Sequence, residues 1–131
     1  MTAFEVDQFL PHPPAKVWRF LTEPDAVATW WAAARDIKPV VGHAFTVDMG
    51  AWGHQPCEVL EVVEPERLVY SFTERWQLTW TLVPEGTGTR LLLEHSGFDL
   101  DDPQDRFAFD NMGQGWRDEI LPRLTDVLAA D

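Results

Sequence analysis

Apolar and polar side chains alternate through much of the chain between residues 44 and 95, a pattern that indicates strands with one buried face. The clearest run is 76–82, in which Trp or Leu occupies every second position. We expect strands over 3–10, 44–49, 57–63, 68–72, 76–82 and 90–95. Only short connections separate neighbouring runs from residue 44 onward, and short connections favour antiparallel pairing.

A spacing of three and four residues predicts helices on either side of these strands. Residues 15–22 form one short helix after Pro13-Pro14, and Pro24 opens a second that ends at 30–32. The apolar stripe of a long C-terminal helix consists of Phe109, Met112, Trp116, Ile120, Leu124 and Val127. Pro122 removes a backbone donor, so we expect a kink near 118–122.

The order of these elements indicates an α+β protein with two short helices after the first strand. A sheet with one apolar face must bury it, and the C-terminal helix carries the large apolar stripe. We therefore expect a curved, six-stranded antiparallel sheet wrapped around that helix. The chain has 131 residues, 45% of them hydrophobic, which suits a single domain over 1–131.

Charge and cysteine content limit the setting and the partners. The chain has 22 acidic and 10 basic residues, for a net charge of −12, which disfavours nucleic acid and anionic membranes as partners. Cys57 is the single cysteine, so an intrachain disulfide is excluded. The chain lacks an apolar run long enough to cross a membrane, and its start does not resemble a signal peptide. We expect a cytoplasmic protein.

Several segments carry a family resemblance. Residues 13–24 resemble the opening of the START-like superfamily (also called SRPBCC), and 79–91 resemble its second-last hairpin. Its heat-shock-protein-90 ATPase activator homologue-like branch is matched by His95-Ser96-Gly97-Phe98, Gly115-Trp116, Trp30-Trp31 and 41–45. The resemblance covers roughly residues 4–128. It implies a helix-grip fold with a cavity between the sheet and the last helix.

The same resemblance leaves the function open. START-like proteins include lipid-transfer modules, hormone receptors and aromatase/cyclases for polyketides, so the fold does not settle the activity. The eukaryotic co-chaperone of this branch also has a separate N-terminal domain that engages the chaperone, for which this chain has no room.

Seven tryptophans in the chain suggest an aromatic interior. The residues that we expect to line a ligand cavity are Trp30, Trp31, Phe45, Met49, Trp80, His95, Met112 and Trp116. The competing interpretation is that these side chains simply fill the core. His95 shares a strand face with Leu91 and Leu93, so it is either a polar contact for a ligand or a structural histidine with a nearby partner.

Metal, cofactor and nucleophile motifs do not emerge from the sequence. The histidines His12, His43, His54 and His95 are scattered, and we expect neither a metal nor a cofactor. The candidates for acid–base chemistry are Asp48, Glu74, His95 and Asp110, but no spacing brings two of them together. We assign no catalytic residue and favour binding without turnover, with enzymatic activity left open.

The segment 99–131 is strongly acidic, with nine carboxylates against three arginines. It is either a helix cap with a solvated face or a docking surface for a basic protein.

The aromatic interior and the family resemblance together predict binding of a small hydrophobic or aromatic ligand. The alternatives are a protein-interaction or stress-response module that modulates a chaperone ATPase, and a polyketide cyclase-like enzyme. A monomer and a homodimer are both compatible with the sequence.

Overall fold

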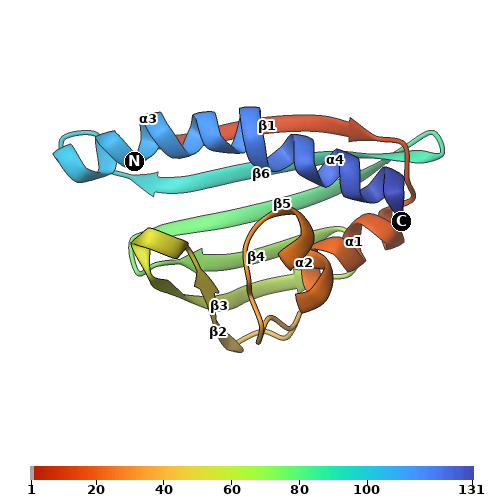
Figure 1. The fold of residues 1–131 in the computed structure, drawn as a ribbon, viewed down its shortest axis with the longest axis horizontal. Coiled ribbons are helices and arrows are strands. Elements are labelled where there is room, and N and C mark those ends of the chain that lie inside the picture. The colour runs from red at the N-terminus through yellow and green to blue at the C-terminus, as the bar shows by residue number, and fades with distance from the viewer. Residues whose placement is uncertain (1) are drawn as a thin grey trace.

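A computed structural model describes residues 2–131, apart from the side chain of Trp52. The described residues form one six-stranded antiparallel sheet in the order β1-β6-β5-β4-β3-β2. Its strands are β1 (Thr2–Leu10), β2 (Ala44–Asp48), β3 (His54–Val63), β4 (Arg67–Phe72), β5 (Trp76–Glu85) and β6 (Gly88–Phe98). The connection from β1 to β2 holds the N-terminal helices and leads to the far edge of the sheet (Figure 1).

All strands except β2 are longer than the alternation alone predicted, and β2 ends one residue earlier than expected. The hairpin between β5 and β6 is the clearest case, because Glu85 already pairs with Gly88 and only two residues form the turn. Gly86 adopts a positive φ of 61°, a conformation that glycine tolerates without a steric penalty. The connection over 83–89 that the expected strands left between them is therefore too wide, since turn chemistry does not show where pairing begins.

Two short helices follow β1, as expected, and both begin with proline. They are α1 (Pro14–Thr22) and α2 (Pro24–Trp30), and a proline in the first turn loses no helical hydrogen bond. Val17, Phe20 and Leu21 of α1 are buried, and their spacing of three and four residues places them on one face of the helix. Lys16 donates from Nζ to the backbone oxygen of Leu128, which ties α1 to the C-terminus.

The C-terminal stripe forms three consecutive helical segments along the sheet. These are α3 (Pro103–Gly115), the π-helical turn η2 (Trp116–Ile120) and α4 (Leu121–Ala130). Pro122 lies in the first turn of α4 and cannot donate to the backbone oxygen of Asp118. The expected irregularity near 118–122 is present as a wide turn that starts slightly earlier, at Trp116. In Figure 1, α3 and α4 run beside β1 and β6, and the C-terminus lies near α1.

One hydrophobic cluster joins all these layers. It extends from Leu10 of β1 through Trp30, Tyr70 and Trp80 to Leu128 of α4. The inward residues Leu78, Trp80 and Leu82 of β5 and Leu91 and Leu93 of β6 are buried, as their alternation predicted, and Trp76 is half-buried. His95 is buried among them, between Leu78 and Phe4 on the neighbouring strands. The α+β architecture with a curved sheet against the C-terminal helices is thus confirmed.

Candidate functional site

Five rings from separate elements form a closed circuit of contacts on the inner side of the sheet. Centroid separations are 5.3 Å from Trp31 to Trp116, 6.3 Å from Trp116 to His95, and 5.7 Å from His95 to Trp76. Trp76 lies 6.3 Å from Phe72, which lies 5.9 Å from Trp31. We call Trp31, Phe72, Trp76, His95 and Trp116 the five-ring cluster. It brings together β4, β5, β6, the end of α2 and the start of η2.

Two further predicted residues extend this network. Trp30 lies 6.2 Å from Trp31 and 5.8 Å from Trp80, and Trp80 lies 5.6 Å from Trp116, all between ring centroids. Five of the eight expected lining residues, namely Trp30, Trp31, Trp80, His95 and Trp116, therefore belong to one connected aromatic group.

The other three expected lining residues are not members of this connected aromatic group. Phe45 packs against Tyr70 at 5.2 Å, and Tyr70 accepts a hydrogen bond from Trp80. Met49 and Met112 are half-buried and pack against the hydrophobic core. A lining role for these residues stays a prediction.

Phe72 and Trp76 are central to the cluster but were not among the expected lining residues. They flank the short β4–β5 connection and lie directly opposite each other in the strand register. Strand alternation had already placed both on apolar faces, so the register of this hairpin was the missing signal.

His95 is fully buried and accepts at Nδ1 a hydrogen bond of 3.1 Å from Nε1 of Trp116. An indole nitrogen can only donate, so Nδ1 is unprotonated and the hydrogen of the neutral ring resides on Nε2. Desolvation by burial lowers the pKa of His95 to about 3. The imidazole is therefore neutral near pH 7 and presents an N–H donor from Nε2.

Three buried nitrogens lack a hydrogen-bond partner among the described residues: Nε1 of Trp31, Nε1 of Trp76 and Nε2 of His95. The other indoles described here are paired, with Trp18 bonded to Glu64, Trp30 to the Phe20 oxygen and Trp80 to the Tyr70 hydroxyl. A buried donor without an acceptor is costly, and native proteins contain few of them. All three unpaired donors belong to the five-ring cluster.

The cluster is poorly equipped for proton transfer. Of the four acid–base candidates, Asp48, Glu74 and Asp110 are exposed, and only His95 lies in the interior. The basic nitrogen of His95 is already bonded to Trp116. Burial raises the pKa of Cys57 to about 12, so its thiol stays protonated near neutral pH. The arrangement suits hydrogen bonding and stacking with a bound molecule.

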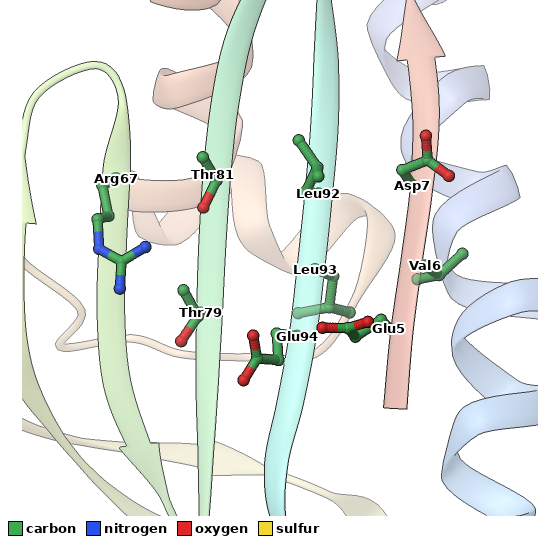
Figure 2. A pocket seen from close by; sticks show the side chains of 9 residues that line it. All are labelled: Glu5, Val6, Asp7, Arg67, Thr79, Thr81, Leu92, Leu93 and Glu94. Carbon is green, nitrogen blue, oxygen red and sulfur yellow. The ribbon is translucent and has the colours of Figure 1, made fainter. Parts of the chain in front are cut away.

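Surface hollows occur outside the five-ring cluster. The hollow drawn in Figure 2 lies on the outer side of the sheet, over β1, β6 and β5, with Arg67 of β4 at its margin. The volume of this hollow is about 320 Å³. Its polar lining includes Glu5 and Glu94, which lie directly opposite each other on β1 and β6. A second hollow of about 390 Å³ lies at the end of β6 and is lined by Thr2, Phe98 and 99–101. A cavity between the sheet and the last helix stays a prediction.

The acidic segment 99–131 begins with a helix cap. Asp102 is the N-cap of α3 and accepts a hydrogen bond from the backbone N–H of Gln104. Nη2 of Arg75 lies 2.5 Å from Oδ2 of Asp102 and 2.7 Å from Oδ1 of the buried Asp105. Oδ2 of Asp105 also accepts a hydrogen bond from the backbone N–H of Asp99. Part of this acidity therefore stabilises the fold by joining α3 to the β4–β5 turn.

Described positions 2–131 contain no group of three or more His, Cys, Asp or Glu side chains arranged to hold a metal ion. The same part of the chain contains no helix with the length and hydropathy of a membrane span.

The antiparallel sheet closed by a C-terminal helix, with aromatic rings between the two layers, defines a START-like protein of the helix-grip class. The family model described as Activator of Hsp90 ATPase homolog 1-like protein matches residues 11–129. The chain belongs to this family, which confirms the resemblance read from the sequence.

Solved structures support the same assignment. Protein MLL2253 from Mesorhizobium loti is 34% identical, with a TM-score of 0.87 and 98% of each chain covered. Protein BH1534 from Bacillus halodurans shares 24% identity and the fold, with a TM-score of 0.84 over 98% of this chain and 97% of its own. DynU16, from the dynemicin biosynthetic locus, is 25% identical with a TM-score of 0.81 over 97% of this chain and 47% of its own. No curated protein matches the sequence.

Proposed function

We propose that this protein binds a small hydrophobic or aromatic molecule between the sheet and the C-terminal helices. The observation that carries the proposal is the connected group of rings from α2, the sheet and η2, in which Trp30, Trp31, Trp80 and Trp116 lie within about 6 Å of one another along the chain of contacts. Aromatic side chains supply large apolar area and favourable ring geometry for a planar guest. We also propose that the protein is cytoplasmic and forms a single domain.

A guest would enter by displacing side chains at the margin of the core. Trp31, Met49 and Met112 are half-buried, in contrast to the fully enclosed Trp30 and Trp80. Methionine adapts its shape readily, so such residues can repack around different guests. Membership of DynU16 in a biosynthetic locus supports a small-molecule role for a structure of this kind.

The chemistry of the interior favours binding without turnover. A cyclase-like reaction needs a group that accepts or releases a proton near the bound molecule. His95 is neutral, and its basic nitrogen accepts from Trp116. We therefore assign these residues to holding a ligand.

A thermal-shift screen of the purified protein tests the proposal, using fatty acids, flavonoids and uncharged polycyclic aromatics. A ligand at 100 times its dissociation constant stabilises the native state by about 2.7 kcal/mol, which is a shift of several degrees for a domain of this size. We expect Trp31→Ala to abolish the shift. Trp18→Ala is the matched control, because Trp18 lies outside the network and bonds to Glu64. Equal loss in both variants, or no shift with any compound, would contradict the proposal.

A second candidate is a protein-interaction or stress-response module that contacts a chaperone through the acidic C-terminal region. It is favoured by Asp110, Asp118, Glu119 and Asp126, which are exposed and form no ion pair with any residue in the described part of the chain. A basic partner held there should be released as salt rises. Binding to an immobilised chaperone that is lost in Asp118→Asn/Glu119→Gln would support this role, and salt-independent or absent binding would exclude it.

A further inference from the structure

The unpaired donors of the five-ring cluster restrict the chemistry of the molecule that fits there. Trp31, Trp76 and His95 each present a buried N–H without an acceptor among the residues described. Indole nitrogen has no accepting capacity, and Nδ1 of His95 is already used by Trp116. A guest at this place gains hydrogen bonds by bringing acceptor atoms and gains none from a hydroxyl hydrogen.

His95 and Trp76 are the two unpaired donors whose rings are in contact. Their centroids are 5.7 Å apart at an interplanar angle of 75°, and both rings contact Phe72 and Phe98. A carbonyl oxygen accepts two hydrogen bonds, one on each lone pair. The contact between these two rings therefore favours one oxygen shared by His95 Nε2 and Trp76 Nε1.

The surroundings of this pair favour an uncharged guest. The neutral His95 supplies no positive charge. The guanidinium of Arg75 lies 5.9 Å from the Trp76 ring, but its charge is balanced by Asp102 and Asp105. An anion buried against the pair would therefore lack a counterion, which is strongly unfavourable.

The second surface hollow lies next to the same place. Phe98 contributes to its lining, and the Phe98 ring packs at 4.7 Å from His95 and 5.3 Å from Trp76. Phe98 thus lies between the hollow at the end of β6 and the donor pair.

We propose that the ligand of this protein is an uncharged, planar aromatic ketone or quinone whose carbonyl oxygen accepts hydrogen bonds from His95 and Trp76, with its rings stacked in the five-ring cluster. The inference rests on the proposed function, because it specifies the chemistry of a ligand bound at that site. It assigns the discrimination between carbonyl and hydrocarbon guests to these two residues.

The test compares three tricyclic probes with one ring skeleton: 9-fluorenone, fluorene and fluorene-9-carboxylate. We expect 9-fluorenone to bind about tenfold more tightly than fluorene, the effect of one or two additional hydrogen bonds, and the carboxylate to bind more weakly than either. In NMR titrations the indole N–H signal of Trp76, identified by its disappearance in Trp76→Phe, should shift downfield with 9-fluorenone and not with fluorene.

Trp76→Phe keeps a ring and removes the donor, so the preference for 9-fluorenone should fall to about threefold or less. Trp31→Phe is the matched control, because it removes an unpaired indole donor that has no ring contact with His95. It should leave the preference for the ketone intact. Folding of both variants is checked by their unfolding transitions.

The outcomes separate the inference from the proposed function. Equal affinity for 9-fluorenone and fluorene would overturn the carbonyl inference and leave the proposed function standing, with the donors then serving an internal water. Tightest binding of the carboxylate would overturn the requirement for an uncharged guest. If none of the three probes binds up to its solubility limit, the carbonyl inference fails, and the thermal-shift screen decides the proposed function separately.

Discussion

Trp116 donates a buried hydrogen bond to Nδ1 of His95 across the interface between η2 and β6. The donor is 2% exposed and the acceptor is fully buried, so this bond links the C-terminal helices to the sheet in a medium that water does not reach. It also fixes the tautomer of the imidazole.

Trp116→Phe should lower the free energy of unfolding by about 2–3 kcal/mol, because it leaves His95 Nδ1 without a donor and removes part of a packed ring. Trp18→Phe is the control and should cost less, since its partner Glu64 is exposed and can return to water. Urea denaturation measures both. An equal loss of unfolding free energy in the two variants would show that the hydrogen bond to His95 contributes no more to stability than the bond to Glu64.

The buried neutral state of His95 should make stability depend on pH. The folded-state pKa is about 3, so between that value and the unfolded value of 6.5 the unfolded chain binds a proton that the folded chain does not. Stability therefore falls as pH drops through this window, by up to about 1.4 kcal/mol per pH unit from this residue. Denaturation curves from pH 7 to 4.5 should be less pH-dependent in His95→Asn. Parallel pH profiles for the two proteins would contradict the assignment.

Two glycines of the C-terminal helix should respond to alanine in opposite directions. A Cβ on Gly113 would lie 2.5 Å from Cδ2 of Phe4, whereas a Cβ on Gly115 would meet nothing within 4 Å. Gly115→Ala should gain up to about 1 kcal/mol of helix propensity. Gly113→Ala should lose about 1 kcal/mol net, because the clash with Phe4 exceeds that gain. Thermal denaturation of the two variants measures both changes in stability. Stabilisation by Gly113→Ala would contradict the prediction, because it would show that the Phe4 ring moves aside freely.

Arg75→Gln should destabilise the junction between the β4–β5 turn and α3. The substitution leaves the buried Asp105 without its cation, at a cost of about 1–3 kcal/mol. Arg90→Gln removes an arginine bonded to the exposed Glu85 and should change stability little. Denaturant midpoints of the two variants should therefore differ clearly. Similar midpoints would place the Arg75 pairs among ordinary surface contacts.

Local pattern in the sequence was sufficient for most of the secondary structure. The period-two runs around Trp80 and His95 place those side chains inward whatever the strands pair with, because alternate side chains of a strand point to opposite faces. Pro14 and Pro24 mark the helix starts for an equally local reason, the missing N–H. The period of two in the strands and the spacing of three and four residues in the C-terminal helix together predicted an aromatic interior.

Pairings between distant segments required the tertiary structure. The register that sets Phe72 opposite Trp76, and the approach of Trp116 to His95 over 21 positions, arise from strand pairing and helix docking. The unpaired donors of Trp31 and Trp76 are likewise invisible in the sequence, since an indole finds or lacks an acceptor only when remote segments pack around it. The sequence thus determined which side chains face inward, and the tertiary structure decided which of them meet, because contacts across the core depend on the relative placement of whole elements.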